Sequence, residues 1–130
     1  MNKEFIPYEQ ALELKELGFD EECLAFYHQN ERLEVDSLGI KRNHYRAKIG
    51  VLAPLYSQAF RFFRENYTLF SSVNVDQTME PKFCYSISRY EPEQFLDGWD
   101  IVVFNSDLYL TYEEAELECL KKLIEIAKTK

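Results

Sequence analysis

Apolar side chains recur at helical spacing in two segments of the first half of the chain. Residues 8–17 lie between Pro7 and Gly18, which favours a helix that begins at the proline and ends at the glycine. A second helix is predicted to start after Ala53-Pro54 and to continue to about Asn66. Its apolar stripe consists of Tyr56, Ala59, Phe60, Phe63 and Tyr67, and its polar face of Ser57, Gln58, Arg61, Arg64 and Glu65.

A third helix is predicted after Thr111, where Glu114 completes a capping box and acidic residues suit the first turn. Glu118 and Lys122 form a favourable pair four residues apart, and the helix continues to about Lys128. The inward stripe of this helix is expected to contain Tyr112, Ala115, Cys119 and Leu123.

Between these helices, apolar and polar residues alternate with a period of two, as in strands. Strands are predicted at about 23–28, 33–35, 41–49, 67–75, 83–88 and 99–104. The resulting order, α-β-β-β-α-β-β-β-α, indicates an α+β protein in which antiparallel meanders pack against three helices.

A length of 130 residues indicates one domain. The three helix starts nevertheless share a Tyr-x-x-Ala pattern at Tyr8, Tyr56 and Tyr112. This pattern is typical of a duplicated αβββ unit, with the second copy starting near residue 53. The alternative is convergence, because a tyrosine in the first turn with an alanine three residues later docks any helix well.

Charge is distributed unevenly along this acidic chain, whose net charge is −8. Residues 1–36 hold 3 basic and 10 acidic residues, and residues 65–130 hold 6 basic and 13 acidic. Residues 37–64 hold 6 basic residues and no acidic one. The overall charge disfavours nonspecific binding to DNA or membranes, whereas the middle segment is a candidate site for an anion.

An extended conformation of residues 41–49 would place the basic side chains of this segment on one face. That face holds Arg42, His44, Arg46 and Lys48, and the opposite face holds Tyr45, Ala47, Ile49 and Val51. Arg61 and Arg64 follow on the second helix, so the candidate partner- or anion-binding residues are Arg42, His44, Arg46, Lys48, Arg61 and Arg64. Two interpretations stay open: the acidic helices neutralise this face within the molecule, or it binds an external anion.

Motifs of catalysis and cofactor binding are missing from the sequence. It has no Gly-rich phosphate loop, no GxSxG and no HExxH, and its three cysteines form no CxxC pair. We therefore expect no enzyme activity, no cofactor and no metal site. Since no apolar run reaches the length of a signal peptide or membrane span, we expect a cytoplasmic protein with reduced thiols.

Aromatic residues are abundant, and four of them lie near predicted loops or strand edges, where exposure would favour a protein interface. These four are Tyr27, Phe70, Tyr90 and Phe95. We expect a small accessory protein that binds another macromolecule, with a protein partner favoured and a homodimer compatible. The alternative is binding of a nucleic acid or nucleotide through the basic segment 41–64.

Residues 8–20, 53–65 and 111–126 together resemble small uncharacterised proteins of Bacteroides-type bacteria and their prophages or other mobile elements. This resemblance covers most of the helices and implies no activity. The C-terminal half also has the α-β-β-β-α order of a double-stranded-RNA-binding domain. Such domains place lysines at the start of the last helix, whereas Glu113 and Glu114 occupy that position here, so the order implies no RNA binding.

Overall fold

The computed structural model describes residues 2–35, 50–76, 82–90 and 100–129, and within them the α+β class and the predicted element order are confirmed. The chain divides into two compact units, Met1–Ala59 and Phe60–Lys130. The described helices are the short 3-10 helix η1 (Asn2–Glu4), α1 (Tyr8–Glu16), α3 (Tyr56–Tyr67) and α4 (Tyr112–Lys128). The strands are β1 (Ala25–Tyr27), β2 (Leu33–Val35), β3 (Val51–Ala53), β4 (Leu69–Asp76), β5 (Lys82–Tyr90) and β6 (Asp100–Asn105).

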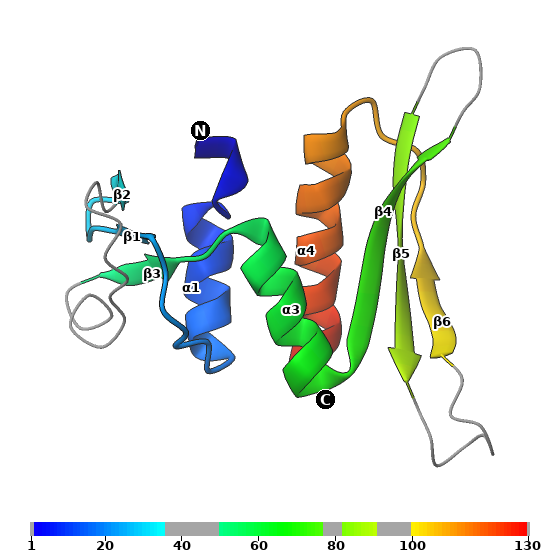
Figure 1. The fold of residues 1–130 in the computed structure, drawn as a ribbon, viewed down its shortest axis with the longest axis horizontal. Helices are drawn as coiled ribbons and strands as arrows, with labels where there is room; N and C mark the ends of the chain where they lie inside the picture. Colours follow the sequence, from blue (N-terminus) through cyan, green and yellow to red (C-terminus); the bar gives the residue numbers. More distant parts are fainter. Residues whose placement is uncertain (1, 36–49, 77–81, 91–99, 130) are drawn as a thin grey trace. The chain divides into compact units, whose positions relative to one another are not determined.

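The first unit packs α1 against a small antiparallel sheet in the order β2-β1-β3 (Figure 1). Its buried centre contains Ile6, Leu14 and Ala53, none of which is exposed to solvent. The hydroxyl of Tyr27 donates a hydrogen bond of 2.6 Å to the carbonyl of Ile6, which ties β1 to the segment before α1.

The end of α1 confirms the predicted role of Gly18, which adopts a φ of +95°. Its N–H donates to the carbonyl of Lys15, and the N–H of Phe19 donates to the carbonyl of Leu14. These two bonds form the Schellman motif, which brings the side chain after the glycine back against the last helical turn. Phe19 is accordingly buried, and the chain is turned toward β1.

The third strand of the first sheet, β3, begins immediately after the predicted strand at 41–49, which lies outside the described residues. Val51, Leu52 and Ala53 are all buried, so β3 has no solvent-facing side. A period-two pattern cannot reveal a strand that is covered on both faces, because all of its side chains are apolar.

Helix α3 has the predicted polar face, with Arg61, Arg64 and Glu65 exposed. The apolar stripe is shifted from the prediction. Phe62, which was not assigned to it, is buried, whereas Phe60 is half-buried. The Phe62 ring lies 5.5 Å from that of Phe63, because the two neighbouring aromatic residues share one wide buried arc.

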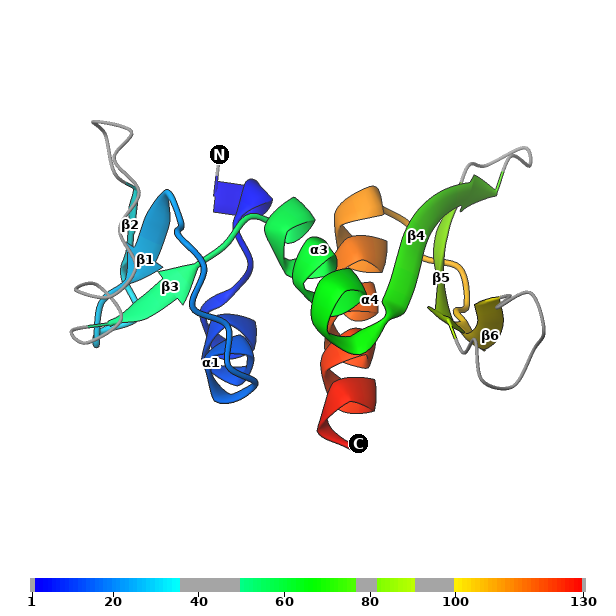
Figure 2. The same cartoon turned by 60° about the horizontal axis from the view of Figure 1, so that its bottom comes forward.

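The second unit places α4 along one face of the antiparallel sheet β4-β5-β6 (Figures 1 and 2). Leu69 and Ile87 of the sheet and Leu120 and Leu123 of α4 are completely buried between them. A register shift between Ile87 and Ser88 marks a bulge in the pairing of β5 with β6. The sheet thus has one face packed on a helix.

The predicted cap of α4 is confirmed, because the N–H of Glu114 donates a hydrogen bond of 3.1 Å to the Thr111 hydroxyl. The predicted pairing of Lys122 is wrong. Its ammonium lies 3.3 Å from the carboxylate of Glu125, and Glu118 pairs instead with Lys121 at 3.0 Å. Both observed pairs are three residues apart, a spacing that also brings helical side chains together.

Candidate functional site

The predicted basic site is described only in part. Arg42, His44, Arg46 and Lys48 lie outside the described residues. Arg61 and Arg64 are exposed on α3, three residues apart and hence on the same side of the helix. The structure therefore leaves the binding role of all six residues as a prediction.

A different surface stands out in the second unit, at the end of the sheet where α4 begins. Large apolar side chains with exposed fractions of 45–73% gather there: Val75, Leu108, Leu110 and Tyr112. We call these four residues the end patch. They account for most of the large exposed apolar side chains among the described residues, the others being Val35 and Phe70. Large apolar side chains left exposed at one end of a sheet are typical of binding sites.

Backbone pairing fixes the segment that carries Leu108 and Leu110. The N–H of Phe83 donates a hydrogen bond of 2.8 Å to the carbonyl of Tyr109. The N–H of Tyr109 donates a hydrogen bond of 2.6 Å to the carbonyl of Phe83. Two residues further along β5, the N–H of Ser106 donates to the carbonyl of Tyr85. Backbone hydrogen bonds at Ser106 and Tyr109 therefore hold this segment beside β5.

Alternation along the strands sets the direction of each side chain. Val75 is paired with Phe83 in the sheet. Both side chains lie on the face covered by α4, the same face on which Tyr85 is buried. Leu108 and Leu110 alternate with Tyr109, whose ring stacks 6.2 Å from that of Tyr85. The end patch thus has side chains on both sides of the sheet end.

Tyr112 corrects the predicted inward stripe of α4. Ala115, Cys119 and Leu123 are completely buried as predicted, but Tyr112 is 45% exposed. It is the first residue of α4, and its ring lies edge-on to the ring of Phe83, with 5.9 Å between the centroids. A residue in the first turn lies where the sheet ends, so helical spacing alone does not bury it.

Acidic residues adjoin the end-patch residues along the chain. We call Asp76, Asp107, Glu113, Glu114 and Glu116 the acidic rim. The basic residue Lys82 lies opposite Asp76 in the pairing of β4 with β5. Burial raises the pKa of Tyr112, and the carboxylates of Glu116 and Glu113 raise it further. Burial also raises the pKa of Tyr109, with contributions from Glu118 and Asp107. The negative field of the rim therefore reaches the aromatic side chains of this end.

Of the four aromatic residues that were predicted to be exposed, the structure describes the exposure of two, and only one of these two is exposed. Phe70 is exposed on β4, whereas Tyr27 is buried in the first unit. Tyr27 follows two buried residues of β1, and its ring packs edge-on against Tyr8 at 5.4 Å, so proximity to a loop did not expose it. The exposure of Tyr90 and Phe95 falls outside what the structure describes.

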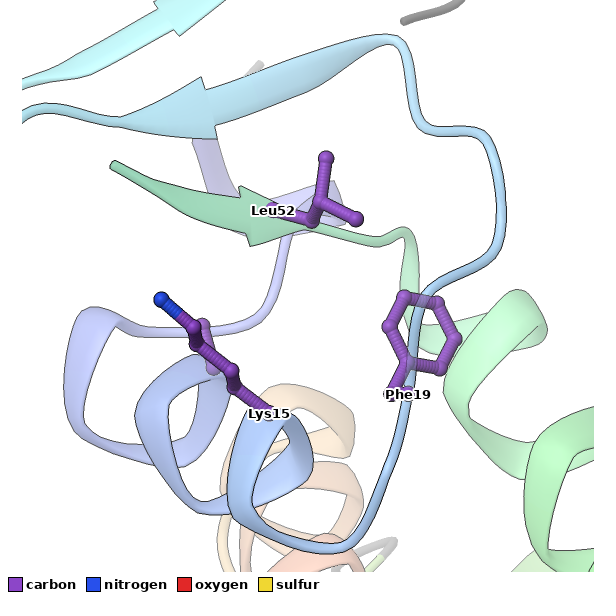
Figure 3. A pocket seen from close by; sticks show the side chains of 4 residues that line it. Lys15, Phe19 and Leu52 are labelled. Atoms are coloured by element: carbon purple, nitrogen blue, oxygen red, sulfur yellow. The ribbon is translucent and has the colours of Figure 1, made fainter. Parts of the chain in front are cut away.

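Two hollows occur in the first unit. A small cavity between α1 and β3 is lined by Ala11, Lys15, Phe19 and Leu52, and its volume of about 10 Å³ suits a single water molecule (Figure 3). An open depression lies at the β1–β2 turn beside His28 and Arg32. There the His28 Nε2 atom lies 2.9 Å from the Glu34 carboxylate. The cavity is too small for a substrate, and the depression is open to solvent rather than enclosed.

Groups with raised pKa values sit in the core of the second unit. Burial raises the pKa of the Cys119 thiol to about 12 and also raises the pKa of the Tyr85 hydroxyl. The three cysteines are free thiols. Within the described part of the chain, no three His, Cys, Asp or Glu side chains gather as a metal ion requires, and no helix is long and apolar enough for a membrane crossing.

Comparison with known proteins gives one partial likeness. The chain is similar to class 3 fructose-1,6-bisphosphatases of three Streptococcus agalactiae strains, with 26% identity over 73 residues. The similar region is 56% of this chain and spans only 11% of the length of these enzymes. No family model matches the chain and no solved structure matches it, so the resemblance to proteins of Bacteroides-type bacteria stays a prediction.

Proposed function

We propose that the protein acts in the cytoplasm as a non-enzymatic accessory protein that binds another protein through the end patch. The observation that carries this proposal is that Val75, Leu108, Leu110 and Tyr112 are all exposed at the same end of the sheet. The three free thiols suit a reducing compartment.

The energetic argument rests on apolar area. An exposed leucine that becomes covered by a partner contributes about 1.5–3 kcal/mol from its removal from water. Leu110 has the largest exposed fraction, 73%, and therefore gains the most from burial. Tyr112 adds an aromatic ring beside it, and aromatic anchors are enriched among the residues that dominate interface energetics. Because Tyr109 is hydrogen-bonded to β5 and Tyr112 belongs to α4, part of this surface is ordered before a partner binds, which lowers the entropy lost on binding.

A Leu108→Ser/Leu110→Ser variant tests the proposal. Immobilised wild-type protein and variant are exposed to extract of the cells that produce the protein, and the retained proteins are quantified by mass spectrometry. We expect a partner retained by wild type to fall by about tenfold or more on the variant, as is typical when interface anchors are truncated.

The matched control is Val35→Ser, which removes an exposed apolar side chain from β2 in the other unit. This control is expected to retain the partner at the wild-type level. Identical retention by all three proteins contradicts the proposal. Light scattering of the purified protein, wild type against the double variant, shows whether the bound partner is a second copy of the chain.

The alternative, binding of a nucleic acid or nucleotide through segment 41–64, is favoured by the six basic residues and the absence of acidic ones in residues 37–64. The exposure of Arg61 and Arg64 supports it. Titration with RNA, DNA, nucleotides and fructose 1,6-bisphosphate at low salt tests this alternative. Binding that weakens steeply with salt and is reduced by Arg61→Gln/Arg64→Gln favours it, and flat titrations exclude it.

A further inference from the structure

Strand β4 forms one edge of the second sheet among the described residues, with β5 as its neighbour in that sheet (Figures 1 and 2). Its pairing with β5 runs from Leu69 opposite Arg89 to Asp76 opposite Lys82 without a register shift. An edge strand presents a row of backbone N–H and C=O groups on its outer side. Because the register is regular, these groups can be assigned residue by residue.

The hydrogen bonds of β5 on the side away from β4 provide this assignment. Phe83 and Tyr109 each donate a backbone hydrogen bond to the carbonyl of the other. The carbonyl of Tyr85 accepts from the N–H of Ser106 in the same way. Phe83 and Tyr85 therefore direct their backbone groups away from β4.

The residues of β4 opposite these two positions have no hydrogen bond to β5. In an antiparallel pair, hydrogen-bonded and non-hydrogen-bonded positions alternate along the strands. Val75 lies opposite Phe83 and Val73 lies opposite Tyr85, so both are non-hydrogen-bonded positions, and Ser71 follows by the same alternation. The N–H and C=O groups of these three residues point outward, and within the described part of the chain they have no backbone partner.

This edge lacks the features that usually prevent strands from pairing. Proteins protect edge strands with lysine, proline, a bulge or a very short strand. Residues 69–75 include no charged residue and no proline, and the pairing of β4 has no bulge. Phe70, Ser72 and Asn74 are exposed, and Val75 is 45% exposed. The edge is therefore open to another extended strand.

We infer that β4 pairs with β4 of a second copy of the chain, antiparallel, across a two-fold axis at Val73. Val73 then lies opposite Val73 of the second copy, and Ser71 lies opposite Val75 of that copy. All three outward-pointing residues of each copy are used, which gives about six hydrogen bonds and one continuous sheet. The inference goes beyond the proposed function and, apart from Val75, rests on other residues.

Symmetry and charge favour a second copy as the occupant. An axis at the middle one of the three outward-pointing residues satisfies all of their groups and keeps side chains of the same face together. Antiparallel pairing also places the two Asp76 carboxylates at opposite ends, whereas parallel pairing would set them side by side. Each copy has a net charge of −8, so contact between copies is least opposed along an uncharged segment such as 69–75.

Sedimentation of the full chain over a range of concentrations, together with amide hydrogen exchange followed by NMR, tests the inference. We expect a monomer–dimer equilibrium. As the dimer fills, exchange at the amides of Ser71, Val73 and Val75 should slow, whereas the amides of Ser72 and Asn74 are protected by β5 at every concentration. A protein that stays monomeric at all concentrations overturns the inference, as does exchange at the three amides that is independent of concentration.

Val73→Pro blocks the edge from within the backbone. Proline removes the outward N–H and no hydrogen bond to β5, and edge strands tolerate proline at such positions. Val73→Ala is the matched control, since it shortens the same side chain and keeps the N–H. We expect the dissociation constant of the dimer to be about tenfold higher or more in Val73→Pro than in Val73→Ala, because each copy loses one hydrogen bond. Equal dissociation constants of the two folded variants overturn the inference.

A second pair of variants decides the question if circular dichroism shows that Val73→Pro is unfolded. Ser72→Lys places an ammonium group on the exposed face of β4, near the same group of the second copy across the axis, and like charges there repel. We expect this variant to weaken the dimer and high salt to restore part of it, whereas the neutral Ser72→Asn leaves the dimer largely intact. Equal dimer formation by both variants contradicts the inference.

Leu108→Ser/Leu110→Ser separates this edge from the end patch. These leucines flank the segment that is hydrogen-bonded to β5 on the side away from β4, so the dimer is expected to persist in the double variant. If the dimer is lost in this variant and persists in Val73→Pro, self-association occurs through the end patch. The inference is then refuted, while the proposed function stands.

Discussion

At the scale of single residues, two glycines of the first unit are required for different reasons. Gly18 needs its freedom of conformation, because its φ of +95° is strained for any residue with a Cβ, although a Cβ there would meet no atom within 4 Å. Gly50 needs space, because a Cβ at this position would collide with the backbone carbonyl of Tyr27 on β1.

Alanine substitutions are expected to separate these two causes. Gly18→Ala should lower the free energy of unfolding by about 1–2 kcal/mol through backbone strain at the end of α1. Gly50→Ala should lower it by about 1–3 kcal/mol, since relieving the collision moves β3 away from β1. Urea denaturation measures both. Wild-type stability of Gly50→Ala would show that the residues before β3 relax without disturbing the pairing.

At the scale of elements, α4 combines stabilising and unfavourable acidic residues. Glu113 and Glu114 lie in its first turn, where the helix dipole stabilises them. Glu116 is half-buried, and burial raises its carboxyl pKa, with Glu113 raising it further. The ionised carboxylate of Glu116 is therefore less favourable in the folded chain than in the unfolded chain.

This shift predicts a pH dependence with a definite sign. Below pH 4.5, the ordinary pKa of the group, the carboxyl is protonated in both the folded and the unfolded chain. As pH rises from there through the higher folded-state pKa, the unfolded chain ionises more readily, so stability falls and stays lower at neutral pH. Glu116→Gln removes this loss. We expect the variant to be more stable than wild type at pH 7.

The gain from Glu116→Gln should shrink toward pH 4, and thermal melts of both proteins across this range measure it. Glu118→Gln, on the same helix, serves as the comparison for the loss of one carboxylate, although it also removes the pair with Lys121. A gain that is the same at pH 4 and pH 7 would contradict the role assigned to ionisation.

Elements with strong local signals were predictable from the sequence. Gly18 ends α1 and Thr111 caps α4, because both signals act on backbone groups within a few residues. The choice of Glu125 over Glu118 as the partner of Lys122 was not predictable. It depends on the Phe104 ring under the ammonium, which belongs to another element.

At the scale of the whole molecule, each compact unit has its own fully buried leucines. Leu14 of α1 is completely buried in the first unit, and Leu123 of α4 is completely buried in the second. Large side chains in close-packed surroundings leave a cavity when they are truncated, and the cavity adds to the lost burial.

Leu14→Ala and Leu123→Ala are each expected to lower the free energy of unfolding by about 2–5 kcal/mol. Urea titration followed by circular dichroism measures both, with the exposed Leu108→Ala as the control, which should change stability by less than about 0.5 kcal/mol. A change as small as that of the control at either buried position would show that the site collapses around the missing side chain.

The amino-acid sequence by itself determined the α+β class, the order of the elements and the segregation of charge. These properties follow from local periodicity, from capping and turn residues, and from counting. Only the tertiary structure decided which apolar side chains stay exposed. Tyr112 was expected inside on helical spacing, and Leu110 had no signal that set it apart. Both are uncovered because the sheet ends beside them, and burial depends on what other elements lie over a side chain, which spacing along the chain does not encode.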